Sequence, residues 1–196
     1  GRRSLLQHQF AGRHGDSASL GDGKALNRMK AQKIFGIVGW KNSGKTTLVE
    51  ALVREMTGRG LLVSTVKHAH HVFDIDVPGK DSYRHREAGA HEVIVASGQR
   101  WALMHELREA PEPPLDALLA KLAPCDLVLV EGFKQGAHPK IEVARFRREE
   151  GLIADQDSAV MAVATDDEAL AGRHLALPLN DAAAIVEFIR KNLAAD

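Results

Sequence analysis

The chain has few of the features that mark secreted, membrane or nucleic-acid-binding proteins. It carries a single cysteine, Cys125, so no internal disulfide can form and a cytoplasmic location is expected. No run of about 18 apolar residues occurs, so no transmembrane helix is expected. Lys and Arg together number 26, as do Asp and Glu, and the resulting zero net charge gives no reason to expect nucleic-acid or membrane binding. What remains is the composition of an ordinary globular protein, 44% hydrophobic and 27% charged.

The first 32 residues differ from the rest. They are rich in Gly, Ser, Arg and His and lack apolar periodicity, which predicts a disordered leader. They also lack the continuous apolar segment of a secretory signal. Because Met29 comes shortly before the first predicted strand, the leader is either an appended, vector-derived segment or a genuine extension. A single folded domain is therefore predicted over residues 33–196.

Beyond the leader, short strands rich in Val, Ile and Leu alternate with amphipathic helices. This alternation predicts an α/β fold in which a mostly parallel sheet is covered by helices on both faces, in three layers. The predicted strands lie at about 33–38, 61–67, 91–96, 101–105, 126–131, 140–146 and 158–164. The predicted helices lie at about 45–58, 80–89, 115–122 and 181–194.

One loop of this pattern matches a phosphate-binding motif. Residues 39–47 read G-W-K-N-S-G-K-T-T and fit G-x-x-x-x-G-K-[ST], with a predicted strand before them and a helix after them. In such a P-loop, backbone N–H groups and the helix N-terminus surround a phosphate. Lys45 would reach the β- and γ-phosphates, and the Thr46 hydroxyl would bind Mg²⁺. The predicted nucleotide-binding residues are Gly39, Asn42, Ser43, Gly44, Lys45, Thr46 and Thr47.

A polar segment follows the second predicted strand, at the sheet edge where α/β proteins bind ligands. Asp74 and Asp76 are two residues apart, so in an extended segment both carboxylates point the same way. They are candidates for holding Mg²⁺ or orienting an attacking water, and a solvated turn is the alternative. Lys67 and Lys80 are candidates for phosphate contacts.

The same segment contains His68, His70 and His71, and imidazole suits zinc and nickel. No cysteine accompanies them and their spacing is irregular. A switch loop that orders around a nucleotide is therefore the favoured interpretation, with a transition-metal site as the alternative.

Acidic residues follow two further predicted strands. Glu131 ends Leu127-Val128-Leu129-Val130, the position at which P-loop proteins place a carboxylate that binds Mg²⁺ or positions the nucleophile. Thr46, Asp76 and Glu131 are expected to converge on Mg²⁺, with Asp74, Asp76 and Glu131 as catalytic candidates. Asp166 is a candidate for accepting hydrogen bonds from a guanine ring, although a capping role is also typical of such a residue.

Together these stretches resemble the molybdopterin-guanine dinucleotide biosynthesis adapter family of bacterial molybdenum cofactor assembly. The matching segments are G-W-K-N-S-G-K-T-T at 39–47, K-H-A-H-H-V-F-D-I-D-V-P-G-K-D-S at 67–82 and L-V-L-V-E-G-F-K at 127–134, and the resemblance spans about residues 33–166. It implies a P-loop GTP-binding protein that is dimeric and has weak GTPase activity. Its implied partner is the MobA-type guanylyltransferase, which joins GMP to the molybdopterin cofactor.

Two other functions remain open at the level of sequence. A metallochaperone GTPase would use the three histidines as ligands. A small-molecule kinase would use Asp74 or Asp76 to activate a hydroxyl.

Overall fold

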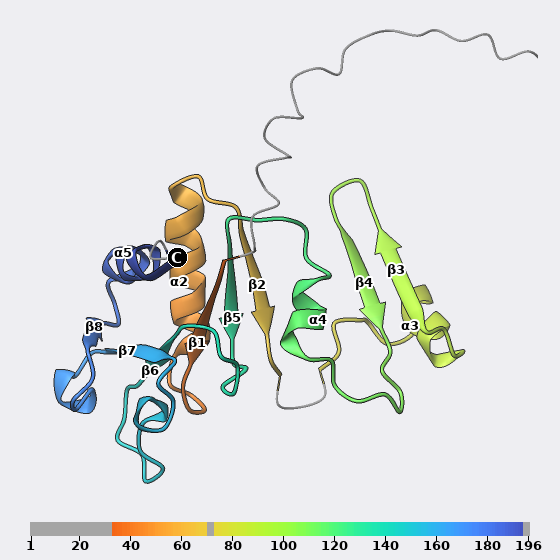
Figure 1. Cartoon of the computed structure of the whole chain (residues 1–196). Helices are drawn as coiled ribbons and strands as arrows, with labels where there is room; N and C mark the ends of the chain where they lie inside the picture. The colour runs from red at the N-terminus through yellow and green to blue at the C-terminus, as the bar shows by residue number, and fades with distance from the viewer. Residues whose placement is uncertain (1–32, 70–72, 194–196) are drawn as a thin grey trace, which may run out of the picture. The chain divides into compact units, whose positions relative to one another are not determined.

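The computed structural model describes residues 33–69 and 73–193, and Figure 1 shows how their helices and strands are arranged. The predicted leader lies outside the described residues. The strands are β1 (Ile34–Val38), β2 (Val63–Lys67), β3 (Glu92–Ala96), β4 (Trp101–His105), β5 (Leu127–Glu131), β6 (Lys140–Val143), β7 (Val160–Thr165) and β8 (Ala176–Pro178). The helices are α2 (Lys45–Gly58), α3 (Asp81–Glu87), α4 (Leu115–Leu119) and α5 (Ala182–Leu193), with 3₁₀ turns η1 (Ile153–Asp155) and η2 (Glu168–Leu170).

Six strands form one sheet in the order β2-β5-β1-β6-β7-β8, and every neighbouring pair is parallel. All carboxyl ends therefore lie along one edge of the sheet. The strand β1 sits between β5 and β6, and its Ile37 is in register with Glu131. Lys67, at the end of β2, is also in register with Glu131. The topology thus brings the ends of β1, β2 and β5 together, which is where an open α/β sheet binds ligands.

Side chains that alternate along the central strands build a core on each face of the sheet. Phe35 and Ile37 of β1 pack with Leu52 and Met56 of α2 and with Ile189 of α5, and all five side chains are fully buried. Burial of each such side chain stabilises the fold by roughly 1.5–3 kcal/mol. One face is therefore covered by α2 and α5, which lie together beside the sheet (Figure 1).

The opposite face is covered by shorter elements. Val128 and Val130 of β5 pack against Leu119 of α4. Further along the sheet, Val38 and Ala154 belong to a second cluster, which joins the ends of β1, β6 and β7 to η1. The sheet is therefore sandwiched, as the sequence predicts.

The strands β3 and β4 form a separate two-stranded antiparallel sheet. Ile94 is in register with Leu103, and Ala96 with Trp101, so these four side chains share one face. Ile94 is 65% exposed and Trp101 68% exposed. This hairpin keeps an apolar face outside the core.

The predicted α/β fold, with a mostly parallel sheet and helices on both faces, is confirmed. The predicted strand at 140–146 ends early, at Val143, and the chain becomes exposed from Phe146 onward. The strand β8 was missed because it has three residues and ends in Pro178, which leaves no apolar run to identify it.

Candidate functional site

The loop between β1 and α2 follows a path that favours glycine at two positions. At Gly39 the φ angle is +149°, and an added Cβ would lie 2.6 Å from both the Ser43 hydroxyl oxygen and the Val143 carbonyl oxygen. At Gly44 φ is +98°, and at Asn42 it is +62°. Side chains rarely tolerate positive φ, so the two glycines set the tight turn of the loop.

The turn ends in a helix whose N-terminus is uncapped. The helix α2 begins at Lys45, no side chain bonds its first N–H groups, and its first turn holds no acidic residue. Unbonded N–H groups and the positive end of the helix dipole favour an anion here. The local structure thus has the features that a phosphate cradle requires, and phosphate binding stays a prediction.

Lys45 lies over this loop and is surrounded by positive charge. Its Nζ donates to the Trp40 carbonyl oxygen at 2.8 Å. Burial lowers the pKa of Lys45, and nearby Lys134 and Lys67 lower it further, while Glu131 opposes them. Three lysines thus face one carboxylate. An anion bound here would balance the excess positive charge and favour the charged form of Lys45.

Thr46, Glu131 and Lys67 meet at the carboxyl ends of the strands. The Thr46 hydroxyl donates to Glu131 Oε1 at 2.8 Å. Lys67 Nζ donates to the same carboxylate oxygen at 3.0 Å and to Thr46 Oγ1 at 3.1 Å. Glu131 is only 8% exposed. The three side chains come from α2, β5 and β2, so their meeting follows from the strand order.

The expected convergence of Thr46, Asp76 and Glu131 is seen for Thr46 and Glu131 only. Asp76 instead accepts from Ser82 Oγ at 2.8 Å and from Arg86 at 3.3 Å. The prediction for Asp76 relied on the chain bending back at Pro78-Gly79, but an arginine on the following helix holds the carboxylate.

Asp74 lies in the same ion-paired cluster. Arg86 Nη1 donates to Asp74 Oδ1 at 2.9 Å, and Arg86 Nε lies 2.7 Å from Glu106 Oε1. The hydrogen bond from Arg86 lowers the pKa of Asp74, and the backbone N–H of Asp76 adds to the effect. The carboxylates raise the pKa of Arg86 in turn. The cluster joins the loop after β2 to α3 and to the end of β4.

The other predicted nucleotide-binding residues are exposed. Asn42 and Thr47 face solvent at the phosphate loop. Lys80 precedes α3 and accepts a backbone hydrogen bond from Arg84 through its carbonyl oxygen. Asp166 is exposed at the end of β7, while its neighbour Asp167 caps η2 by accepting from the Ala169 N–H.

The histidine segment is described only in part. His68 Nε2 lies 2.7 Å from Glu112 Oε1, and its ring contacts the Phe133 ring at a tilt of 33°, with 4.7 Å between centroids. His70 and His71 lie outside the described residues. Within residues 33–69 and 73–193, no three His, Cys, Asp or Glu side chains gather closely enough to hold a metal ion. No helix in the same ranges is long and apolar enough to cross a membrane.

Two side chains at the phosphate loop were not predicted from sequence. Arg145, just beyond β6, packs over the loop, with its Nε 3.1 Å from where a Cβ on Gly44 would lie. The Trp40 ring faces Lys134, whose Nζ is 4.0 Å from the ring centroid. Trp40 Nε1 donates to the Gly151 carbonyl oxygen at 2.9 Å. Arg145 was not singled out from sequence because it fell within the strand predicted at 140–146, which ends at Val143. Arg145 comes to lie against Gly44 because β6 pairs with β1.

Comparison with known proteins finds a matching family model and relatives with the same description. The family model described as Molybdopterin guanine dinucleotide synthesis protein B matches residues 34–166. The molybdopterin-guanine dinucleotide biosynthesis adapter protein of Haemophilus influenzae is 43% identical over 159 residues, which cover 80% of this chain and 86% of the relative. The protein of the same description from Escherichia coli is 40% identical over 166 residues, covering 80% and 90%.

A solved structure agrees with these sequences. The crystal structure of Bacillus subtilis MobB superposes with a TM-score of 0.66 at 26% identity, covering 84% of this chain and 99% of that one. The family match spans the loop after β1, the segment after β2 and the acidic end of β5. The chain therefore belongs to the molybdopterin guanine dinucleotide synthesis protein B family.

Proposed function

We propose that this chain is a GTP-binding adapter with weak, Mg²⁺-dependent GTPase activity that assists formation of molybdopterin guanine dinucleotide. Family membership supports the pathway. The observation that carries nucleotide binding is the meeting of Thr46, Glu131 and Lys67, within 3.1 Å of one another, beside an uncapped helix N-terminus. Hydroxyl, carboxylate and ammonium are the groups that bind a metal-bound triphosphate.

The donor set fits Mg²⁺. This cation prefers oxygen ligands, keeps several waters and takes one or two protein groups together with substrate phosphates. The Thr46 hydroxyl and the Glu131 carboxylate would hold it, directly or through water. Lys67 now bonds both oxygens, so its ammonium would have to turn away, toward the phosphates. Bound Mg²⁺ would supply charge neutralisation of the phosphate oxygens.

Weak turnover is part of this proposal. Fast hydrolysis by P-loop GTPases requires added positive charge on the transition state, often from an arginine. Arg86 is engaged by Asp74, Asp76 and Glu106. Arg145 lies against Gly44 and is the arginine nearest to this role. Nucleotide held without rapid hydrolysis suits an adapter that acts through a guanylyltransferase.

A homodimer is part of this proposal. The apolar face of the β3–β4 hairpin, formed by Ile94, Ala96, Trp101 and Leu103, supports it because monomers seldom leave such a surface uncovered. Each hairpin would bury this face against its copy.

The metal assignment is tested by Glu131→Gln, with Glu50→Gln on the exposed side of α2 as the matched control. We expect Glu131→Gln to remove the Mg²⁺-dependent part of GTP binding, because a neutral amide is a poor ligand for this cation. Glu50→Gln should bind as the wild type does. An unchanged Mg²⁺ dependence in Glu131→Gln would rule out the assignment.

The adapter role is tested by measuring GTP hydrolysis by the isolated protein and cofactor guanylation by a MobA-type enzyme with and without it. Slow hydrolysis together with stimulated guanylation is the expected result. Fast multiple turnover with no association and no effect on guanylation would contradict the adapter role.

A further inference from the structure

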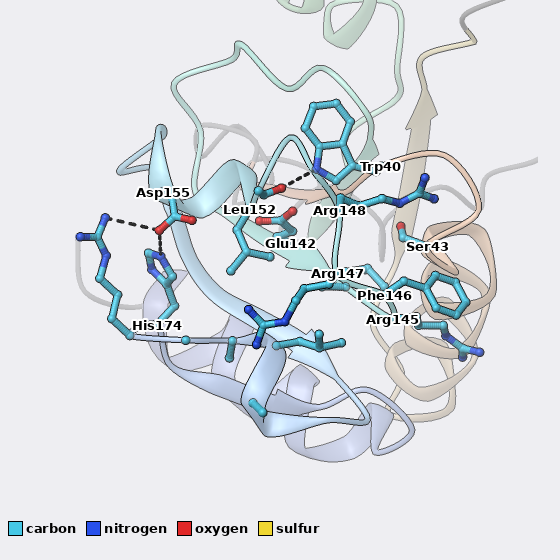
Figure 2. A pocket seen from close by; sticks show the side chains of 18 residues that line it. Trp40, Ser43, Glu142, Arg145, Phe146, Arg147, Arg148, Leu152, Asp155 and His174 are labelled. Carbon is cyan, nitrogen blue, oxygen red and sulfur yellow. Dashed lines mark hydrogen bonds and ion pairs between the residues drawn. The ribbon is translucent and has the colours of Figure 1, made fainter.

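A pocket lies beside the phosphate loop. It has a volume of 290 Å³ and extends from Trp40 and Ser43 to the turns around η1 and η2 (Figure 2). Glu142 of β6 lies within it. Its neighbours Ile141 and Val143 pack in the core beneath α2, so Glu142 points to the opposite face of the sheet. Glu142 therefore lies on the opposite face of the sheet from the pair formed by Thr46 and Glu131, while Trp40 and Ser43 connect the pocket to the phosphate loop.

Unpaired polar atoms gather at this pocket. Among the described residues, three buried side-chain polar atoms without a hydrogen-bond partner belong to residues that line this pocket. They are Ser43 Oγ, Glu142 Oε1 and Arg145 Nε. Buried polar groups are normally paired, so such a concentration indicates groups arranged for a ligand.

Glu142 is the most unusual of the three. Its side chain is 0% exposed, and its Oε2 accepts from the Ala154 N–H at 2.9 Å. Burial raises the pKa of Glu142, while the backbone N–H groups of Ala154 and Ile153 oppose the rise. The carboxyl group has one oxygen paired and the other left over. A buried carboxyl in this state is unfavourable unless another donor completes its pairing.

Three of the cationic side chains around the pocket have other partners. His174 Nε2 lies 3.0 Å from Asp155 Oδ1, and Arg173 lies 3.4 Å from the same oxygen. Arg148 donates to the Lys41 carbonyl oxygen at 2.9 Å. Figure 2 shows His174 and Asp155 at one side of the pocket and Arg148 and Trp40 at the other, with Glu142 between them. None of these three cations donates to Glu142 Oε1, which leaves that oxygen open to a donor from a ligand.

We propose that this pocket binds a planar ring with a 2-amino-4-oxopyrimidine edge, the group shared by guanine and pterin, and that Glu142 accepts its N–H donors. A carboxylate only accepts, and Oε1 together with the second lone pair of Oε2 can accept from a ring N–H and the exocyclic amine beside it. Adenine lacks this adjacent pair of donors. Ligand pockets usually measure about 300–1,000 Å³, so 290 Å³ suits one bicyclic ring.

Entry of the ring requires a local opening, because Glu142 has no exposed surface. The proposal places this opening at the part of the wall formed by Phe146, Arg147 and Arg148, which are exposed, Phe146 by 61%. Arg145 and Ser43 then offer a donor and a hydroxyl to the oxo side of the ring. This inference rests on the proposed function for its choice of ligands. It identifies the ring that would bind in the pocket around Glu142, next to the phosphate loop.

The test is calorimetric titration of the full chain with guanosine, pterin and adenosine. Glu142→Gln removes the charge with little change of shape, and Glu149→Gln, an exposed carboxylate in the adjoining segment, is the matched control. We expect guanosine, pterin or both to bind, and to bind roughly tenfold or more weakly to Glu142→Gln alone. Binding of one ring only would identify the source, either the nucleotide base or the pterin. Absence of binding by both rings, equal binding of adenosine, or equal affinity in Glu142→Gln would overturn the proposal.

Two further measurements keep the result interpretable. If Glu142→Gln does not fold, hydrogen exchange of the Ala154 amide is measured in the wild type instead, because this N–H donates to Glu142. Guanosine or pterin should slow that exchange, and adenosine should not. Unchanged exchange with all three would contradict the proposal. Lys45→Ala separates the two sites: it should keep ring binding and lose the contribution of the phosphates. GTP binding that ignores Lys45 would reject the phosphate site and leave the ring pocket standing.

Discussion

Two β-sheets in this chain have opposite relations to solvent. All five residues of β5, which lies between β2 and β1 in the six-stranded sheet, are buried, whereas Val93 is the single buried residue of β3 in the hairpin. The first sheet is covered on both faces and holds Glu131 and the phosphate loop at its edge. The second exposes Ile94 and Trp101. One region is complete by itself, and the other has a surface suited to a partner.

The two regions are also held in place by different forces. The large sheet is stabilised by packing of fully buried side chains such as Phe35, Leu52 and Leu129. The segment leading to the hairpin is held by the ion pairs of Arg86 with Asp74, Asp76 and Glu106. A site built on a rigid sheet keeps its geometry, while a segment held by partly exposed charges can adjust to another molecule.

The largest contrast is expected in stability. Leu129→Ala, in β5, should lower the free energy of unfolding by about 2–5 kcal/mol, because it leaves a cavity in a closed core. Ile94→Ala, on the exposed face of β3, should change it by less than about 0.5 kcal/mol. Denaturant unfolding at a concentration where the chain is monomeric measures both. Equal losses would show that the hairpin is packed as tightly as the sheet.

The next prediction concerns association. Trp101→Ser should weaken the proposed homodimer roughly 30-fold, because truncation of a central aromatic at an interface costs about 2 kcal/mol or more. Met161→Ser, an exposed apolar residue on β7, is the control and should leave association unchanged. Sedimentation over a range of concentrations gives both values. If the two variants associate equally, the hairpin face is not the interface.

A smaller and more local effect is expected at the ion pairs. Arg86→Met keeps the length of the side chain but leaves Asp74, Asp76 and Glu106 without their shared cation. Amide exchange should then accelerate over residues 74–87 and stay unchanged in β1. Uniform acceleration across the chain would mean that Arg86 supports the whole fold rather than this segment.

The smallest effect concerns pH. Burial raises the pKa of Glu142 above its ordinary 4.5 in the folded protein, so the folded state holds this proton more tightly than the unfolded state does. The contribution of Glu142 to stability therefore falls as pH rises from about 4.5 through the folded pKa. Glu142→Gln removes this titration, and its stability relative to the wild type should increase with pH over that window. Thermal unfolding of both proteins at several pH values checks the sign, and a difference independent of pH would contradict it.

Much of the site could be predicted because its signals are local. The spacing from Gly39 to Thr46 and the apolar run before Glu131 indicate their elements directly, and the structure brings Thr46 to Glu131. The pairing of Asp76 with Arg86 was not predictable, since it depends on how a helix ten residues away returns to the loop. The pocket around Glu142 escaped prediction for a similar reason, because its walls come from segments joined only through the strand order.

The central claim is that the loop after β1 binds GTP through its phosphates with Mg²⁺. Calorimetric titration of GTP and Mg²⁺ into the wild type, Lys45→Ala and Lys41→Ala tests it most directly, since Lys41 is an exposed lysine of the same loop. We predict Mg²⁺-dependent binding by the wild type and Lys41→Ala, and a loss of roughly 100-fold in Lys45→Ala, the size expected for losing hydrogen bonds to charged phosphates. Wild-type affinity in a correctly folded Lys45→Ala would contradict the claim.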